Sequence, residues 1–308
     1  TCGLWRVLLT AASDLPPVLL NELANFYPKV PWTYRPIFAQ MAAANPNAVF
    51  SLVDERAERC AKAELTARPD AFALGEMGPL TLPSPDRVAQ EFGVDGTVGR
   101  MYDDYEPRTE QVDMARAVAE AFGRSGYAAV EAGTGVGKSI AYLLPAALLA
   151  QANDVTVGVA TKSNALTDHL INRELPLLSA ALDKPLSYMA LKGFDNYPCL
   201  RKVDRLARIG MLKDAPEETD EEGQAEGGLA RKLPSPNEDL LNALAAIMAY
   251  SVQSAYGDVN CLGIRWGKVQ RSDVTSTAVE CQKRRCPYFP NKCFLHLARR
   301  RAAACDIV

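Results

Sequence analysis

The stretch EAGTGVGKS, residues 131–139, has the composition of a loop that binds a nucleoside triphosphate. Glycines let the backbone approach a polyphosphate so closely that successive N–H groups can bind its oxygen atoms. We expect Lys138 to reach the terminal phosphates and the Ser139 hydroxyl to bind Mg²⁺, which makes these two the candidate catalytic residues. The other candidate nucleotide-binding residues of the loop are Ala132, Gly133, Thr134, Gly135, Val136 and Gly137.

The residues on either side of this loop support the same interpretation. Residues 127–130 form a short apolar run that predicts a buried strand, and residues 140–151 predict a helix. The N-terminus of that helix adds a partial positive charge beside the phosphates. Ala132 stands where the strict pattern has glycine, and a plain glycine-rich turn is the alternative.

Three residues upstream of the loop form a candidate adenine site. Tyr105, Arg108 and Gln111 come just before an amphipathic helical pattern at residues 112–122. A glutamine amide can pair with both the donor and the acceptor on an adenine edge, and an aromatic ring can stack on its face. Without the phosphate loop downstream, the same trio would indicate an ordinary helix N-terminus.

Residues 155–160 and 186–191 are two further strand-like runs, and helical patterns separate the runs. Strands that alternate with helices predict a parallel, doubly wound α/β domain, in which the residues after each strand meet at one edge of the sheet. Hydroxyl, ammonium and backbone N–H groups at that edge suit nucleic-acid phosphates. The candidate DNA-binding residues there are Thr161, Lys162 and Ser163. An ordinary helix cap by Ser163 or Asn164 is the alternative.

Four of the eight cysteines are candidate metal ligands: Cys199, Cys281, Cys286 and Cys293. In a cytoplasmic chain, clustered cysteines more often bind a metal or a cluster than form disulfides, and four thiolates can hold a four-iron cluster. Zinc is the alternative, since Cys281, Cys286 and Cys293 could bind it together with His296. Cys261 could replace one ligand, and the remaining cysteines are expected to be core or incidental residues.

Charge is distributed unevenly around these cysteines. Residues 214–228 are acidic and rich in glycine, and they predict a solvated loop. Basic residues interleaved with Tyr288 and Phe289 suit single-stranded DNA, although a solvated helix face is the alternative. The candidate DNA-binding residues of this segment are Lys283, Arg284 and Arg285.

The overall composition is that of a globular protein with room for more than one domain. The 308 residues are 48% hydrophobic and 23% charged. A formal net charge of −3 excludes a protein coated in positive charge, although a local basic stripe can still bind nucleic acid. No apolar run approaches the roughly 20 residues that cross a bilayer. The sequence therefore predicts a cytoplasmic protein without a membrane partner.

Residues 1–100 carry no candidate chemistry. Their apolar spacing predicts a mainly helical accessory domain whose expected role is docking to a partner. Basic and aromatic residues are mixed in one short segment, which could bind a single strand, but a rim over a small core is the favoured interpretation. These residues are Lys29, Trp32, Tyr34 and Arg35.

Taken in order, the motifs resemble those of superfamily 2 DNA helicases. The trio around Gln111 resembles their adenine motif, EAGTGVGKS their Walker A motif and VATKSNALTDHL their motif Ia. The resemblance is to the iron–sulfur group typified by DinG and XPD, in which alanine is common at the position of Ala132. One distant cysteine followed by three close ones is similar to the DinG arrangement. His169 departs from the family pattern, which often has glutamine there, and it is left without a role.

The resemblance implies a P-loop NTPase with a RecA-like, doubly wound parallel sheet, an inserted iron–sulfur domain and a mainly helical N-terminal accessory domain. The predicted domains are residues 1–100, the accessory domain; 101–192, the RecA-like domain with its three motifs; 193–297, the iron–sulfur insertion; and 298–308, the return into the RecA-like domain.

The resemblance also implies an ATP-dependent DNA helicase that uses ATP, Mg²⁺ and a 4Fe-4S cluster. Such an enzyme moves 5′ to 3′ along single-stranded DNA and unwinds duplex DNA or R-loops. The family's acidic DExH box and second RecA-like domain are not found in this sequence, and residues 305–308 look like a strand cut short. We therefore expect an N-terminal fragment with negligible ATP hydrolysis of its own.

Several partners and functions are open at this point. The added N-terminal residues resemble the CRISPR-associated DinG of type IV systems, which a guide-RNA protein complex recruits; a housekeeping DinG acting on R-loops is the alternative. A function of another class is a non-hydrolysing binding module that docks to a ribonucleoprotein through residues 1–100. A small-molecule kinase could use the same phosphate loop, but it would leave motif Ia and the cysteines unexplained.

Overall fold

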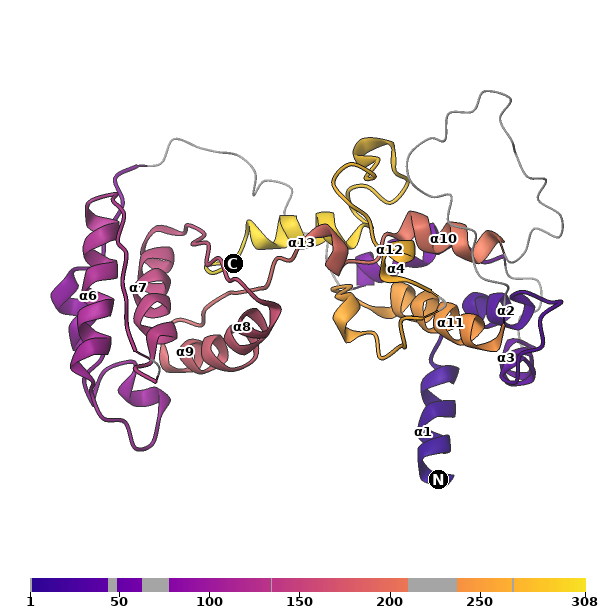
Figure 1. Cartoon of the computed structure of the whole chain (residues 1–308), viewed down its shortest axis with the longest axis horizontal. Helices are drawn as coiled ribbons and strands as arrows, with labels where there is room; N and C mark the ends of the chain where they lie inside the picture. The colour runs from indigo at the N-terminus through magenta and orange to yellow at the C-terminus, as the bar shows by residue number, and fades with distance from the viewer. Residues whose placement is uncertain (1, 44–48, 63–77, 134, 210–236, 268) are drawn as a thin grey trace. The chain divides into compact units, whose positions relative to one another are not determined.

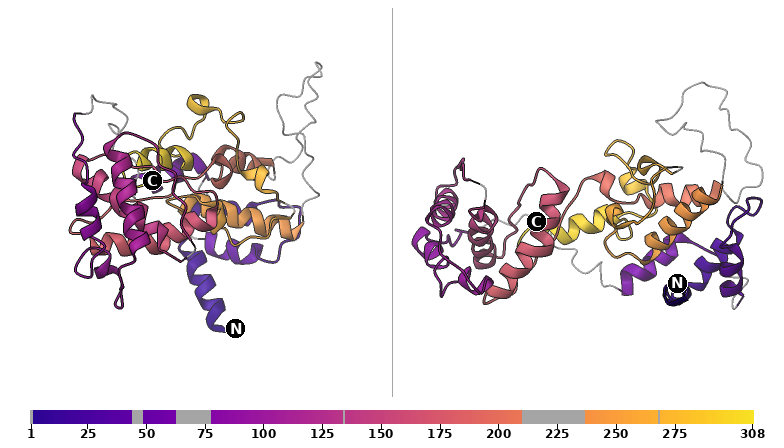
Figure 2. Two further views of the ribbon diagram at one scale, coloured as in Figure 1. Left: turned by 60° about the vertical axis from the view of Figure 1, so that its left-hand side comes forward. Right: turned by 60° about the horizontal axis from the view of Figure 1, so that its bottom comes forward.

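The computed structural model describes residues 2–43, 49–62, 78–133, 135–209, 237–267 and 269–308 (Figures 1 and 2). Its contacts divide the chain into two compact units. Unit 1 comprises Thr1–Ala67 and Lys192–Ala298, and unit 2 comprises Arg68–Leu191 and Arg299–Val308. Each unit is therefore built from two stretches of chain that are distant in the sequence.

Unit 1 is helical in the part that the structure describes. Its longer helices are α1 (Cys2–Ser13), α2 (Pro17–Asn25), α3 (Arg35–Ala42), α4 (Leu52–Lys62), α10 (Leu200–Ile209) and α11 (Glu238–Gln253). Its shorter elements are η3 (Phe194–Asn196), η4 (Val259–Cys261), α12 (Arg271–Val274) and η5 (Lys283–Arg285). Helix α13 (Phe294–Ala302) begins in this unit.

Helix α11 shows why the sequence folds in this way. The Asn237 side chain caps it by accepting a hydrogen bond from the Leu240 N–H at 3.1 Å. Glu238 and Asp239 lie in the first turn, where negative charge is favourable. Apolar residues at helical spacing then enter the core, among them Leu241, Leu244, Ile247 and Met248.

The N-terminal residues pack directly on the segment that contains the cysteines. Helix α4 packs against α11, and the Trp32 Nε1 atom donates a hydrogen bond to Asn242 Oδ1 at 2.8 Å. Trp32 is buried. The Arg35 guanidinium donates four hydrogen bonds to backbone carbonyls, those of Ala24, Phe26, Tyr27 and Val30. Trp32 and Arg35 are therefore structural residues, in agreement with the favoured interpretation of their segment.

Unit 2 is also built around helices. They are α5 (Pro85–Gln90), η1 (Gly99–Met101), α6 (Thr109–Gly123), α7 (Lys138–Asn153), α8 (Asn164–His169), the π-helical turn η2 (Leu170–Glu174) and α9 (Leu175–Ala181). α6 packs against both α5 and α7, and α7 also contacts α9. α7 is apolar on most of its surface, with Ile140, Leu143 and Leu144 buried. No described helix is both long and apolar enough to span a membrane.

The three predicted strands do not form regular strands among the residues that the structure describes. Two of the segments nevertheless pair with the end of the chain, because Val157 and Tyr188 each form a parallel bridge with Ile307. The Val157 N–H donates to the Asp306 carbonyl at 2.8 Å, and the Met189 N–H donates to the Ile307 carbonyl at 3.2 Å. This pairing is compatible with parallel strands, but the doubly wound sheet stays a prediction.

Residues 127–130 differ from the expected buried strand. Tyr127 and Val130 are exposed, and no strand is formed there. A strand needs a neighbouring backbone to pair with its N–H and C=O groups. Among the described residues, no other segment forms backbone hydrogen bonds with 127–130.

The segment before α6 packs in unit 2 and not with residues 1–67. Val88 and Phe92 are fully buried in the same core as Ala115 and Ile140. The contacts therefore change from one unit to the other between Ala67 and Arg68, whereas the sequence suggested a boundary at residue 100. Contacts alone do not define a domain, so the predicted domain boundaries stay a prediction.

Phe92→Ala should lower the free energy of unfolding of unit 2 by about 3–5 kcal/mol, because the variant empties a buried site in the core of this unit. Hydrogen exchange followed by mass spectrometry would detect this as faster exchange in α6 and α7. Val94→Ala is the matched control: Val94 is 65% exposed, and its loss should change stability by less than about 0.5 kcal/mol. Faster exchange confined to residues 85–101 would contradict the shared core.

Candidate functional site

The predicted phosphate loop is followed by α7, as the sequence pattern requires. Gly135 and Gly137 have φ angles of 85° and 78°, which L side chains rarely adopt. A Cβ atom on Gly137 would also lie 2.2 Å from the Gln111 Nε2 atom. Glycine is therefore required at position 137 both by the backbone conformation and by the close approach of Gln111.

Lys138 begins α7, and its side chain folds back onto the loop. The Nζ atom donates hydrogen bonds to the carbonyls of Ala132 and Gly133, both at 2.8 Å. In this arrangement the ammonium group binds oxygen atoms of the loop itself, so a polyphosphate would have to replace these acceptors. Thr134 lies outside the described residues.

Ser139 lies in the first turn of α7, next to Tyr142. Burial raises the pKa of the Tyr142 phenol, whereas a hydrogen bond with the Ser139 side chain lowers it. The Ser139 side chain thus lies at the N-terminal end of the helix, near the Tyr142 phenol. Its predicted role as a Mg²⁺ ligand stays a prediction.

The structure brings the three residues of the predicted adenine site to this loop. The Gln111 Nε2 atom donates to the Gly137 carbonyl at 2.9 Å, and the Arg108 guanidinium donates to the Gly135 carbonyl. The Tyr105 hydroxyl lies 3.1 Å from the Phe92 carbonyl and 3.4 Å from the Gln111 Oε1 atom, and it can donate to either. Gln111 is buried, so in this structure its amide holds the loop. Recognition of adenine stays a prediction.

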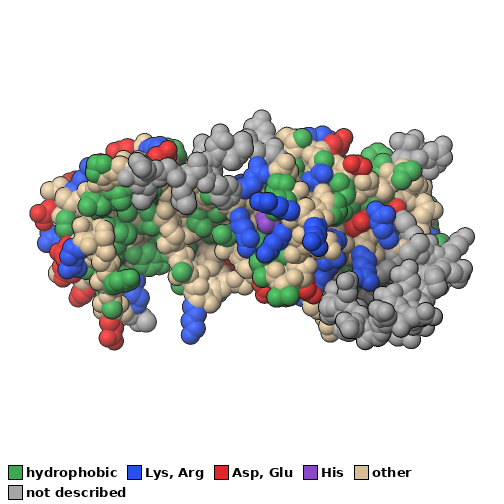
Figure 3. Space-filling model, turned by 90° about the horizontal axis from the view of Figure 1, so that it is seen from above, with side chains coloured by type: hydrophobic (Ala, Val, Ile, Leu, Met, Phe, Trp, Pro, Cys, Tyr) green, Lys and Arg blue, Asp and Glu red, His purple; other side chains and the backbone are tan. Residues whose placement is uncertain are grey.

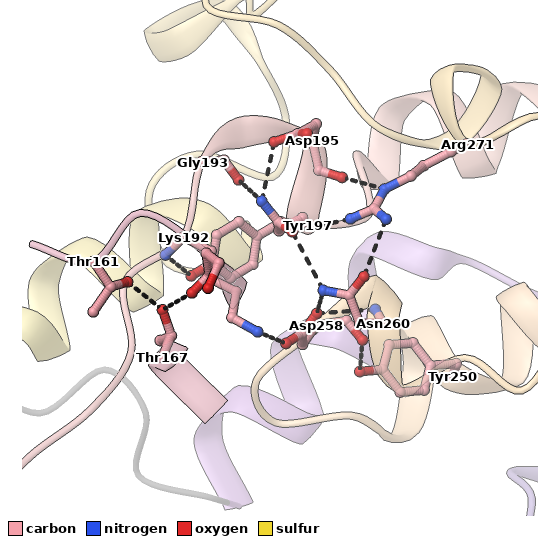
Figure 4. Close-up of polar contacts among 12 residues, drawn as sticks. Thr161, Thr167, Lys192, Gly193, Asp195, Tyr197, Tyr250, Asp258, Asn260 and Arg271 are labelled. Atoms are coloured by element: carbon pink, nitrogen blue, oxygen red, sulfur yellow. Dashed lines mark hydrogen bonds and ion pairs between the residues drawn. The ribbon is translucent and has the colours of Figure 1, made fainter. Parts of the chain in front are cut away.

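The segment of the predicted DNA-binding residues Thr161, Lys162 and Ser163 precedes α8. Ser163 caps this helix by accepting a hydrogen bond from the Leu166 N–H at 3.3 Å, which confirms the helix cap considered from the sequence. The Thr161 and Thr167 hydroxyls lie 2.6 Å apart (Figure 4). Lys162 is exposed. The cap does not exclude phosphate binding, which stays a prediction.

The four predicted metal ligands line one pocket in unit 1. Cys199 precedes α10, Cys281 and Cys286 flank η5, and Cys293 precedes α13. His296 also lines the pocket, whereas Cys261 does not. The structure therefore brings together the cysteines that the sequence singled out, and His296, the alternative zinc ligand, lies among them.

The thiols in this pocket are partly buried. Burial, opposed by backbone N–H groups of Leu295 and His296 and assisted by the neighbouring Cys199 and Cys286, raises the pKa of Cys293 to about 11. Burial also raises the pKa of Cys286. These thiols are protonated at neutral pH, so binding of a metal would have to release their protons.

The cysteine pocket does not have the geometry of a site for a single ion. Among the described residues, no three His, Cys, Asp or Glu side chains converge in the way that one metal ion requires. In a four-iron cluster each thiolate binds a different iron atom, so the sulfur atoms stand farther apart than they do around one ion. All four cysteines line one pocket, and their placement there is compatible with the wider spacing of a cluster.

Polar contacts hold the segment before Cys199 in place (Figure 4). The Lys192 Nζ atom forms an ion pair with Asp258 at 2.7 Å. The Arg271 guanidinium donates to the Asp195 carbonyl at 2.8 Å and to the Asn260 Oδ1 atom at 3.0 Å. These contacts fix the loop that leads into the cysteine pocket against two later segments of unit 1.

A second ion pair lies beside two of the cysteines, and sequence reasoning missed it. Lys202 is buried, and its Nζ atom lies 3.2 Å from the Glu280 carboxylate, directly before Cys281. Burial acts to raise the pKa of Glu280, but hydrogen bonds from Lys202 and Thr277 outweigh it and hold the pKa below its ordinary value. No local pattern in the sequence pairs these two residues, which are 78 positions apart.

The basic residues around η5 are accessible, although one of the neighbouring rings is not. Lys283, Arg284 and Arg285 are exposed, and Figure 3 shows Lys and Arg side chains gathered on one face of the molecule. Tyr288 is buried, so the expectation that its ring stacks on bases is wrong in this structure. The Phe289 ring contacts His296 edge to face, with centroids 4.6 Å apart. The acidic segment 214–228 lies outside the described residues.

Comparison with known proteins identifies relatives for most of the chain, although no protein-family model matches it. It is 29% identical over 224 residues to the ATP-dependent DNA helicase YoaA of Haemophilus influenzae, covering 72% of the chain and 31% of that protein. It is 31% identical over 222 residues to YoaA of Escherichia coli, covering 72% of the chain and 30% of that protein.

A third relative is the ATP-dependent helicase DinG of Mycobacterium tuberculosis, with 34% identity over 207 residues, covering 65% of the chain and 29% of that protein. The chain thus spans between 29% and 31% of the length of these relatives. The resemblance to DinG-like helicases is confirmed: this chain is homologous to part of the DinG and YoaA proteins.

Proposed function

We propose that the chain is the ATP-binding part of a DinG-type, ATP-dependent DNA helicase that moves 5′ to 3′ on single-stranded DNA and unwinds duplex DNA or R-loops. The observation that carries the proposal is the contact of Gln111 and Arg108 with the carbonyls of Gly137 and Gly135. These contacts bring the predicted adenine site and the predicted phosphate loop together. The names of the relatives support the same activity.

In this proposal the phosphate loop binds ATP with Mg²⁺. The Lys138 ammonium group exchanges the carbonyls of Ala132 and Gly133 for oxygen atoms of the terminal phosphates. Ser139 contributes its hydroxyl to Mg²⁺, and the N-terminus of α7 favours the negative charge. Tyr105, Arg108 and Gln111 would contact the base, and the contacts of Arg108 and Gln111 with the loop support this role.

Four thiolates of the cysteine pocket would hold a 4Fe-4S cluster. The donor set fits, because Cys199, Cys281, Cys286 and Cys293 line one pocket whose other walls include Tyr288 and Phe289. When bound, the cluster would supply bonds that join three separate segments of unit 1. Such bonds stabilise a fold in which the apolar core is small.

Single-stranded DNA is the proposed partner, bound through Lys283, Arg284 and Arg285 and through Thr161, Lys162 and Ser163. The exposed guanidinium groups of η5 support this, because arginine pairs well with phosphate oxygens. Recruitment by a CRISPR guide-RNA complex and a cytoplasmic location belong to the same proposal. The alternative, a non-hydrolysing docking module, is favoured by the exposure of Leu4, Val7 and Leu8 on α1.

Lys138→Ala should weaken binding of Mg²⁺–ATP by about 10- to 100-fold, because it removes charge-assisted hydrogen bonds worth about 1.5–3 kcal/mol. Isothermal titration calorimetry on the chain at fixed salt measures the change. Lys184→Ala is the matched control, since Lys184 is an exposed lysine of the same unit. Equal affinities in wild type and Lys138→Ala would eliminate the phosphate-loop proposal.

Cys286→Ser should remove most of the iron from anaerobically purified protein, which is expected to carry about four iron atoms per chain. Metal analysis and the visible absorption spectrum measure the loss. Cys261→Ser is the control, because Cys261 lies in the same unit but does not line the pocket. Colourless wild-type protein that contains zinc would rule out the cluster.

Arg284→Gln should reduce the salt dependence of single-stranded DNA binding, with the slope of log K against log salt falling by about 0.7 for one lost phosphate contact. Fluorescence anisotropy with an oligonucleotide at several salt concentrations measures the slope. Lys29→Gln removes one exposed charge elsewhere in unit 1 and should leave the slope unchanged. If both variants behave alike, η5 is not part of a DNA-binding surface.

A further inference from the structure

Arg56 is a buried charge in a part of the chain to which no role is assigned. It lies on α4 and is inaccessible to solvent. Its Nη1 atom donates to the Ser254 carbonyl at 2.6 Å. A buried guanidinium group is costly unless oxygen or aromatic partners surround it, so its contacts identify what holds it there.

Two of these contacts lie on either side of Cys293. The Arg56 Nη2 atom donates to the Lys292 carbonyl at 3.5 Å, and the guanidinium lies 4.1 Å from the centroid of the Phe294 ring. One side chain from residues 1–67 thereby touches the residue before and the residue after a predicted cluster ligand. A planar guanidinium can bind carbonyls at its edge and stack on a ring with its face at the same time.

The Phe294 ring is confined from a further direction. Gly257 has a φ angle of 72°, and a Cβ atom there would lie 2.2 Å from the Phe294 Cγ atom. The ring thus packs against bare backbone at Gly257 and against Arg56. The Cys293 N–H also donates to the Tyr288 carbonyl at 2.8 Å. Arg56 therefore completes a set of contacts that leaves the backbone of Cys293 little freedom to move.

We propose that Arg56 is a positioning residue that holds Cys293 in the cysteine pocket, so that residues 1–67 form part of the architecture of the cluster site. The contacts that carry this inference are independent of what the pocket binds. The benefit to a bound cluster rests on the function proposed above. Loss of Arg56 leaves the carbonyls of Ser254 and Lys292 without this donor and the Phe294 ring without its cation.

The test is the alkylation rate of each pocket cysteine in the whole, anaerobically purified chain, followed by mass spectrometry. Arg56→Met should raise the rate at Cys293 by about tenfold relative to Cys281, which corresponds to about 1.4 kcal/mol in an opening equilibrium. Arg56→Lys should restore part of the protection, because an ammonium group keeps the charge but lacks the planar fork. General loss of structure would instead raise the rate at all four cysteines.

Two further variants make the result decisive. Arg59→Met removes a neighbouring arginine of α4 that donates to the Gln253 carbonyl at 2.7 Å, and it should leave the rate at Cys293 unchanged. Phe294→Leu removes the ring and should raise the rate at Cys293 even if Arg56→Met does not fold. An unchanged rate at Cys293 in folded Arg56→Met, or an equal rise at all four cysteines, would overturn the inference.

The iron content of the wild-type protein distinguishes a failure of this inference from a failure of the cluster proposed for the pocket. If the wild type contains the cluster, its visible absorbance should fade faster with a chelator in Arg56→Met than in Arg59→Met. If the wild type contains no iron, the cluster proposal fails, while the alkylation rates still decide whether Arg56 positions Cys293.

Discussion

A hydrogen-bond donor that is taken out of water needs an acceptor, because a buried donor without one costs about 1–3 kcal/mol. In unit 1, Arg56 meets this requirement for its two Nη atoms with the carbonyls of Ser254 and Lys292, which lie far along the chain, whereas its buried Nε atom has no hydrogen-bond partner among the described residues. In unit 2, Gln111 meets it with the carbonyl of Gly137. The same constraint therefore joins distant segments of each unit, and in both cases it does so beside a candidate site.

The phosphate loop was the easiest part to predict from the sequence, because the residues that define it are adjacent in the chain. Lys138 does begin a helix, and Gly137 does adopt a conformation suited to glycine. The order of the motifs predicted that Gln111 lies near the phosphate loop. Its burial could not be predicted, because burial depends on how other segments of unit 2 pack around it. The segment 127–130 shows the same limit, because strand formation depends on neighbours and not on apolar residues alone.

The resemblance to the DinG arrangement predicted that Cys199 would join the three later cysteines, and all four line one pocket. The sequence did not reveal which residues pack around these cysteines. Lys202 and Glu280 are ordinary charged residues in the sequence, and only the fold brings the buried Lys202 ammonium to the partly exposed Glu280 carboxylate. The packing of residues 1–67 on the cysteine-containing segment was likewise beyond sequence patterns, because contacts such as Trp32 to Asn242 connect residues with no local relation.

The chain leaves unit 2 after Leu191 and returns to it at Arg299. Close to these two points, the Ser187 hydroxyl donates to the Asp306 carboxylate at 2.7 Å, and the Asp306 N–H donates to the Ser187 carbonyl at 2.9 Å. The two segments by which the chain leaves and re-enters unit 2 thus lie side by side. Ends that lie close together tolerate the insertion of another segment between them. The segment between them packs with residues 1–67 in unit 1, so any exchange of this segment would have to preserve contacts such as those of Trp32 and Arg56.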